Sequence, residues 1–196
     1  MNGVVHVGAH TGQEVPLYLA AGRAPIICFE PQLLEWDHPS NVKLFRTALS
    51  DHSGTLNMRI PHHLHTNLYR DTQSASGLPL IHQRARDIGW TPTPFDVTEV
   101  PMIRFDEWAK EHEFQNGSCS YLVIDVQGME LQVLMGFGKC LSGFQEMKIE
   151  CSQPAVYEGG ASAQEIIGFL AQNGFLQTSP TVAHGDIFFS KGVIVE

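Results

Sequence analysis

The sequence predicts an α/β fold in which a mostly parallel central sheet is covered by helices on both faces. Short apolar runs alternate with stretches of helical periodicity along the 196 residues. The runs are continuously apolar, which is typical of strands buried on both faces. With 43% apolar and 17% charged residues, the chain can build a sizeable core. Its length favours a single domain over residues 1–196.

The first half of the chain carries four predicted strands. They lie at residues 4–7, 26–29, 42–45 and 54–60. A helix is expected between the first two strands, over residues 12–21, with Gly22 as its stop. Thr11 and Glu14 have the spacing of a capping box, which would close the start of this helix.

The second half continues the alternation of helix and strand. Strands are predicted at residues 121–124, 144–149, 187–189 and 193–195. Helices are predicted over residues 104–112 and 128–135, and a third helix begins at Ser162. Ser162 and Glu165 form a second capping box, and Asn173-Gly174 ends that helix.

Residues 61–101 break this pattern. Pro, Gly, Ser, Thr and His are frequent there, and the periodicity is weak. A segment of this length without regular elements is usually a functional loop, a lid or a disordered region. We therefore expect an irregular insertion or lid over residues 61–101.

The composition excludes several classes of protein. Lys and Arg number 12 against 21 Asp and Glu, a net charge of −9, so a nucleic-acid partner is not expected. No apolar run is long enough to span a membrane, and the N-terminus lacks a signal-peptide pattern. The four cysteines show neither disulfide nor zinc spacing. These features predict a cytoplasmic protein.

Polar residues and glycines follow the predicted strands at the places where parallel α/β sheets bind ligands. Residues 8–12 follow the first strand, Glu30 follows the second, and Asp125 and Glu150 follow two later strands. The carboxyl ends of parallel strands meet at one edge of the sheet, so we expect these residues to share a crevice.

The turn Gly8–Gly12 suits a nucleoside ligand that lacks a diphosphate. His10 and Gln13 stand where the dinucleotide-binding pattern requires glycines, and the Walker pattern is absent. Glu30 follows Gly8 by 22 residues, and a carboxylate there can accept hydrogen bonds from both ribose hydroxyls. A ribose without a pyrophosphate indicates S-adenosylmethionine as the cofactor.

Four motifs, in order, resemble those of the FkbM-type methyltransferases. They are Val5-His6-Val7-Gly8-Ala9-His10-Thr11-Gly12, Phe29-Glu30-Pro31, Ala48-Leu49-Ser50 followed by Gly54, and Ile124-Asp125-Val126-Gln127-Gly128-Met129-Glu130. The resemblance runs from about Val4 to Phe175. It implies a Rossmann-like class I methyltransferase fold with an antiparallel C-terminal strand. It also implies an S-adenosylmethionine-dependent enzyme. The family mostly methylates hydroxyls of sugars and natural products, so the resemblance implies an acceptor of that kind.

The same resemblance implies a set of cofactor-binding residues. The glycine turn would hold the methionine part, Glu30 the ribose, and residues 48–50 would lie near the adenine. The set consists of His6, Gly8, Ala9, His10, Thr11, Gly12, Glu30, Pro31, Ala48, Leu49, Ser50, Asp125 and Val126. His6 stands where the family often has Asp, and His10 where it often has Asn. The anchor of the amino-acid end of the cofactor is therefore left open.

Asp125 is the first candidate for orienting or deprotonating the acceptor, because a hydroxyl is a poor nucleophile until its proton leaves. The alternative is that Asp125 only binds the amino group of the cofactor. Candidate acceptor-binding residues are Ser76, His82, Arg84, Gln127, Glu150 and Tyr157. Arg70, Arg84 and Arg86 could bind an anionic acceptor such as a phosphorylated or acidic sugar, or could equally pair with nearby carboxylates. The run His62-His63-Leu64-His65 has no acidic cluster beside it, so no metal site is predicted.

Histidine is unusually frequent, with ten residues against 12 lysines and arginines. Six of the ten lie in or beside the glycine turn or within residues 61–101. This placement predicts activity that depends on pH near neutrality. The other four histidines, His184 among them, are expected at the surface.

Together these observations predict an S-adenosylmethionine-dependent O-methyltransferase that acts on a hydroxyl of a sugar, glycan or small natural product. Two alternatives stay open. One is an enzyme of the same fold that methylates nitrogen or a macromolecule. The other is a non-catalytic nucleotide-binding module. The sequence does not define the oligomeric state.

Overall fold

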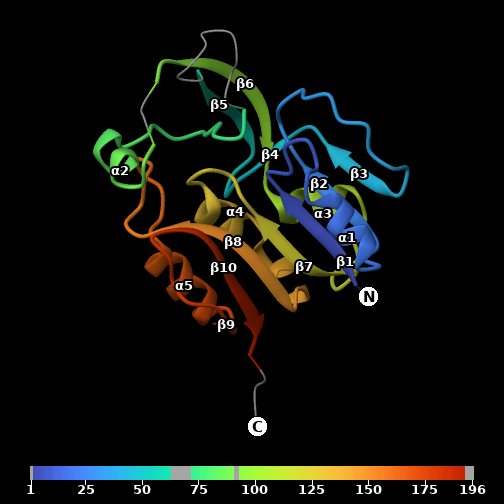
Figure 1. Cartoon of the computed structure of the whole chain (residues 1–196). Helices are drawn as coiled ribbons and strands as arrows, with labels where there is room; N and C mark the ends of the chain where they lie inside the picture. Colours follow the sequence, from blue (N-terminus) through green and yellow to red (C-terminus); the bar gives the residue numbers. More distant parts are fainter. Residues whose placement is uncertain (1, 63–71, 91–92, 193–196) are drawn as a thin grey trace.

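The largest element of the structure is a seven-stranded sheet in the order β3-β2-β1-β7-β8-β10-β9 (Figure 1). This computed structural model describes residues 2–62, 72–90 and 93–192. The strands are β1 (Gly3–Val7), β2 (Ile26–Phe29), β3 (Val42–Phe45), β7 (Cys119–Ile124), β8 (Glu146–Ser152), β9 (Phe175–Gln177) and β10 (His184–Lys191). Strands β3, β2, β1, β7 and β8 are parallel, whereas β10 is antiparallel to β8 and β9. The predicted sheet with an antiparallel C-terminal strand is confirmed.

Helices cover both faces of this sheet, as the continuously apolar strands predict. On one face α1 (Val15–Ala20) packs Val15 and Tyr18 against residues of β1, β2 and β3. The other face carries α3 (Phe105–Glu111), α4 (Glu130–Gly136), the short 3₁₀ helix η1 (Gly138–Gly143) and α5 (Ala163–Gln172). These elements build the larger core, whose centre is a stack of the Phe105 and Phe137 rings, 4.0 Å apart.

A second sheet, in the order β4-β6-β5, lies at one end of the large sheet (Figure 1). Its strands are β4 (Ala48–Leu49), β5 (Gly54–Pro61) and β6 (Phe95–Ile103), and β5 pairs with β6 along its whole length. Met58, Val100 and Met102 from this sheet form a separate apolar cluster with Met129, the residue before α4. The second sheet therefore covers the end of the large sheet where the parallel strands terminate.

Residues 61–101 are more regular than the sequence indicates. They contain α2 (His82–Asp87) and most of β6, so the expected irregular segment is partly wrong. Pro101 prevented the prediction of β6 from the sequence, because proline cannot donate a hydrogen bond to a neighbouring strand and is uncommon within strands. In the structure Pro101 lies within β6, opposite Thr55 of β5.

Two other predictions of local structure need correction. The Thr11–Glu14 capping box is wrong, since Glu14 itself is the N-cap of α1 and its side chain makes no capping hydrogen bond. The strand expected at residues 144–149 is shifted, so Glu150 lies within β8 rather than after it. The strand expected at residues 193–195 falls outside the described residues. The capping box of Ser162 and Glu165 is confirmed at the start of α5.

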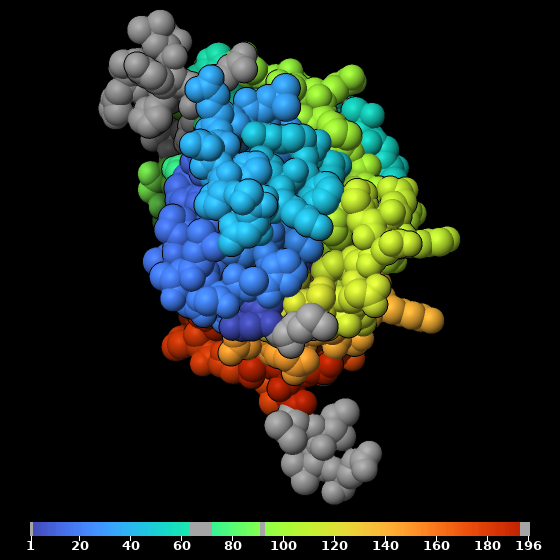
Figure 2. Space-filling model, turned by 90° about the vertical axis from the view of Figure 1, so that its right-hand side faces the viewer, coloured from blue at the N-terminus to red at the C-terminus, as the bar shows by residue number. Residues whose placement is uncertain are grey.

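Different parts of the chain form the two ends of the molecule. Figure 2 shows the N-terminal residues, in blue, over much of one face, with the C-terminal part of the chain, in orange and red, at the bottom. Strands β5 and β6 lie at the opposite end (Figure 1). No helix within the described ranges is both long and apolar enough to cross a membrane.

Candidate active site

The turn after β1 packs directly on the end of β7. The backbone N–H groups of Gly8 and Ala9 donate to the Phe29 carbonyl at 2.9 and 3.2 Å. Gly8 has a φ of +81°, and a Cβ on it would lie 1.8 Å from the carbonyl oxygen of Asp125. Only glycine fits this conformation and this approach. The glycine therefore brings the β1 turn and Asp125 together at the point where the sheet order reverses.

Glu30 ends β2 with its carboxylate held in a fixed orientation. Its Oε2 accepts the backbone N–H of His10, and its Oε1 accepts that of Gln32, both at 2.9 Å. Each oxygen keeps one further lone pair for a ligand. Burial raises the pKa of the Glu30 carboxyl, and the two backbone N–H groups offset part of that rise. The Oε1 of Gln32, beside it, has no hydrogen-bond donor among the described residues.

A cavity of about 410 Å³ opens at the carboxyl ends of the parallel strands, within the size range of small-molecule sites. The second sheet contributes Leu56 and Met58 to its wall, and Thr72 and Ala75 lie on a further side. The predicted site residues that line it are His6, Gly8, Ala9, His10, Glu30, Pro31, Ala48, Leu49, Asp125, Val126, Gln127 and Glu150. The structure thus brings together residues from four strand ends.

Seven predicted site residues do not line this cavity. They are Thr11, Gly12, Ser50, Ser76, His82, Arg84 and Tyr157. Gly12 instead makes room for the ring of Trp36, which a Cβ would approach to 1.9 Å. Ser50 is fully buried and donates to Asp51. His82 and Arg84 lie on the exposed side of α2, away from the cavity wall.

Ser76 and Tyr157 form hydrogen bonds with Gln127, which lines the cavity. Ser76 Oγ donates to the Gln127 carbonyl at 2.6 Å, and the Tyr157 hydroxyl donates to Gln127 Oε1 at 3.0 Å. The amide of Gln127 then donates to Asp125 Oδ1 at 2.8 Å and to Glu150 Oε2 at 2.7 Å. Gln127 therefore holds the two carboxyl groups side by side. A glutamate there would supply no N–H donors to either.

Asp125 and Glu150 form a buried pair of carboxyl groups that share a hydrogen bond. Burial raises the pKa of both, and the neighbouring Asp125 and Glu130 charges raise that of Glu150 further. Two adjacent carboxylates in a buried site cannot both ionise readily, so the pair retains one proton at neutral pH. The hydrogen bond between the two groups lowers the pKa of Asp125 and raises that of Glu150, so the proton lies on Glu150 and Asp125 is the ionised member.

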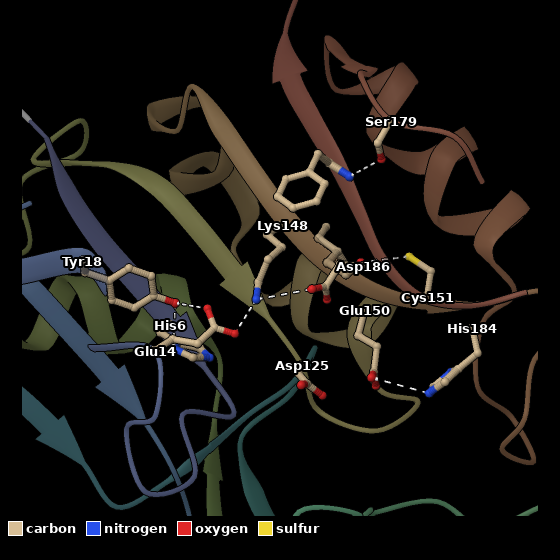
Figure 3. A network of polar contacts seen from close by, with 12 residues as sticks. His6, Glu14, Tyr18, Asp125, Lys148, Glu150, Cys151, Ser179, His184 and Asp186 are labelled. Carbon is tan, nitrogen blue, oxygen red and sulfur yellow. Dashed lines mark hydrogen bonds and ion pairs between the residues drawn. The ribbon is translucent and has the colours of Figure 1, made fainter. Parts of the chain in front are cut away.

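His184 and Trp90 are among the site residues that the sequence did not predict. His184 was expected at the surface, but its Nε2 lies 3.6 Å from Glu150 Oε1 (Figure 3). Its Nδ1 lies 2.8 Å from Ser152 Oγ. Trp90 lines the cavity and contacts the His184 ring, with centroids 4.9 Å apart. Neither carries a sequence signal, because the register of β10 against β8 and the course of the chain after α2 decide their positions.

His10 connects the turn after β1 to Thr72 on another side of the cavity. The Gln13 amide donates to His10 Nδ1 at 2.8 Å, so Nε2 carries the proton and donates to Thr72 Oγ1 at 2.7 Å. Gln32 Nε2 also donates to the Thr72 carbonyl at 2.9 Å. Thr72 is thereby tied to the turns that follow both β1 and β2.

The described residues contain no group of three or more His, Cys, Asp or Glu side chains arranged to hold a metal ion. His62 pairs with Asp96 at 3.1 Å on the second sheet. His63 and His65 lie outside the described residues. Gln127 and His184 contact the carboxyl pair at the cavity with polar side chains.

The strand order and the antiparallel β10 define a Rossmann-like α/β fold of the class I methyltransferase type. The chain belongs to the FkbM methyltransferase family, because the methyltransferase FkbM domain matches residues 6–176. The family resemblance that the motifs predicted is confirmed.

One solved structure with the same fold is methyltransferase FkbM from Methylobacillus flagellatus KT. It superposes with a TM-score of 0.56 at 10% sequence identity, over 96% of this chain. This chain spans 43% of that protein's length. A comparison with curated proteins gives no match.

Proposed function

We propose that this protein is an S-adenosylmethionine-dependent O-methyltransferase that acts in the cytoplasm on a hydroxyl of a sugar or small natural product. The observation that carries the proposal is a single cavity whose wall contains both Glu30 and the Asp125–Glu150 pair. Glu30 suits a ribose, and the carboxyl pair suits a hydroxyl that must lose a proton.

The residues around the cavity fit the cofactor. The two free lone pairs of the Glu30 carboxylate match the two hydroxyls of a ribose. Ala48 and Leu49, with Met58 from the second sheet, offer an apolar wall for an adenine ring. When bound, S-adenosylmethionine supplies an electrophilic methyl group on a sulfonium.

The carboxyl pair fits an acceptor that donates a hydrogen bond. Asp125 accepts from Gln127 through Oδ1 and keeps lone pairs for an acceptor O–H. With the cofactor bound, Asp125 would take the proton of the acceptor hydroxyl during methyl transfer. Leu56 adds apolar lining to the cavity, and an apolar lining favours alignment of the reacting atoms. Among the described residues that line the cavity there is no arginine to pair with an anionic acceptor.

Replacing Glu30 by alanine should weaken S-adenosylmethionine binding by about 1–3 kcal/mol, a loss of roughly 5- to 150-fold in affinity. The variant loses the charge-assisted hydrogen bonds to the ribose and the anchor of two backbone N–H groups. Titration calorimetry measures the change. Glu99→Ala removes an exposed carboxylate of β6 that does not line the cavity, and its affinity should equal that of the wild type.

Two measurements decide the function. Absence of S-adenosylmethionine binding at millimolar ligand would overturn the proposal, both for an O-methyltransferase and for an N-methyltransferase. Mass spectrometry of products from a panel of sugars, hydroxylated metabolites and amines then identifies the acceptor atom. Methylation of amines alone would replace the O-methyltransferase by an N-methyltransferase, and binding without any product would favour a non-catalytic module.

A further inference from the structure

His6 is a buried side chain with one ring nitrogen unused by the protein. The residue is 4% exposed, and its side chain belongs to the cavity wall. Its Nδ1 lies 3.1 Å from the Tyr18 hydroxyl. Within the part of the chain that the structure describes, Nε2 has no hydrogen-bond partner, and it is not among the fully enclosed unpaired atoms. Nε2 is therefore the atom that His6 presents to the cavity.

A chain of polar contacts behind His6 fixes which of its nitrogens carries the proton (Figure 3). Lys148 Nζ contacts Glu14 Oε1, and the Tyr18 hydroxyl donates to Glu14 Oε2 at 2.8 Å. Burial alone would raise the pKa of the Glu14 carboxyl, but the bonds from Lys148 and Tyr18 bring it below its usual value. Glu14 is thus ionised and can only accept.

The consequence for His6 follows from counting hydrogens. Tyr18 has a single hydroxyl hydrogen, which it gives to Glu14, so its oxygen must accept from His6 Nδ1–H. Burial lowers the pKa of His6 to about 4, so the ring is neutral at physiological pH. A neutral ring with its proton on Nδ1 has a lone pair on Nε2. His6 is therefore a hydrogen-bond acceptor and does not titrate near neutrality.

The position of His6 relates this acceptor to one end of the ligand. If Glu30 holds the ribose and Ala48 and Leu49 face the adenine, the amino-acid end extends toward the rest of the wall, where His6 and Glu14 lie. Both side chains present acceptors there, one a lone pair and one a carboxylate. Such a pair matches a protonated amine and would repel a carboxylate.

We propose that His6 binds the α-ammonium group of the cofactor through Nε2, and that the Lys148–Glu14–Tyr18 chain holds His6 in the tautomer that allows it. This assignment rests on the proposed function, because it assumes S-adenosylmethionine. In this assignment the group on β1 that accepts a hydrogen bond from the ammonium is a neutral imidazole rather than a carboxylate. His6 and Tyr18 are positioning residues for the ligand rather than participants in methyl transfer.

Two nucleosides separate this role from a general effect on the site. S-adenosylhomocysteine carries the amino-acid end, and 5′-methylthioadenosine has the same adenine, ribose and thioether without it. His6→Leu should weaken S-adenosylhomocysteine binding roughly 10- to 100-fold in titration calorimetry, while methylthioadenosine binding changes by less than about twofold. Glu30→Ala, the control, should weaken both ligands equally.

Tyr18→Phe keeps the ring that packs against β1 and removes the hydroxyl that selects the tautomer. We expect a loss of roughly two- to fivefold for S-adenosylhomocysteine alone, because only part of the His6 population then offers the Nε2 lone pair. Nitrogen-15 NMR of histidine-labelled wild-type protein reads the tautomer directly. Nε2 should be unprotonated in the free protein and become hydrogen-bonded on addition of S-adenosylhomocysteine.

Three results would overturn the assignment. They are a proton on Nε2 in the wild type, an unchanged affinity for S-adenosylhomocysteine in His6→Leu, and an equal loss for both nucleosides in that variant. Failure of the proposed function looks different. In that case wild-type protein binds neither nucleoside, whatever the state of His6.

Discussion

Asp125→Asn should lower turnover by roughly 100- to 10,000-fold while cofactor affinity stays within about threefold of the wild type. The range is the usual contribution of a positioned general base. Asparagine has nearly the same shape and can still accept from the Gln127 amide through Oδ1. The hydrogen-bonded frame of the site is therefore preserved, and the loss falls on proton transfer from the acceptor.

Glu150→Gln is the matched control for this variant. Glu150 retains the shared proton at neutral pH, so a neutral amide resembles its working state. Turnover should fall by less than about tenfold, since the substitution removes no base. Equal losses in the two variants would show that the carboxyl pair organises the cavity without a distinct base. Full activity in Asp125→Asn would assign proton transfer to another group.

The same pair determines the pH dependence. Burial raises the pKa of Asp125 above its usual value, so a second proton binds the pair at a higher pH than it would bind an exposed aspartate. Turnover should be present above that titration and fall as the pH drops through it. The groups facing the pair are Glu130 on α4, and His184 and Asp186 on β10. A pH–rate profile with saturating cofactor should show this acid limb, and Asp125→Asn should abolish it.

His184 bears on the same profile. Burial lowers its pKa, so its charged form contributes less near neutrality than an exposed histidine would. With His6 neutral as well, the carboxyl pair is the better source of any titration at this site. The excess of histidine in the composition therefore explains less of the chemistry than the sequence alone suggests.

The sequence predicted those parts of the site that follow from strand ends. Glu30 and Asp125 come directly after apolar runs, and a parallel sheet must bring such positions to one edge. The residues that close the cavity could not be found this way. Thr72 reaches it through contacts with His10 and Gln32, which are more than 35 residues away, and no periodic pattern encodes them.

The predicted site residues that do not line the cavity show the same limit of the sequence. Arg84 carries the right charge for an acidic acceptor, but α2 leaves it exposed at the surface, 4.0 Å from Asp87. Composition gave no information on that orientation. Tyr157 and Ser76 were placed at the acceptor, and the structure gives them contacts with Gln127 instead. A side chain one layer behind a cavity has the same sequence signal as one that lines it.

Gly8→Ala should lower the free energy of unfolding by about 3–5 kcal/mol, a large effect for one methyl group. The alanine would have to hold a φ near +81° and place its Cβ 1.8 Å from the Asp125 carbonyl oxygen. That oxygen belongs to backbone at the end of β7, so it cannot rotate away as a side chain could. Relief requires moving the turn from β7, which also separates the two halves of the cavity.

Gly22→Ala isolates the backbone term of this effect. Gly22 has a φ of +66° after α1, and nothing lies within 4 Å of the position of its Cβ. Its alanine variant should lose only about 1–2 kcal/mol, from left-handed backbone strain alone. Urea denaturation, with equal slopes in all variants, measures both losses. If the two glycines give the same loss, the close approach of Gly8 to Asp125 adds nothing, and the turn is free to move. A loss several-fold larger at Gly8 would mean that the fold itself depends on the contact that assembles the site.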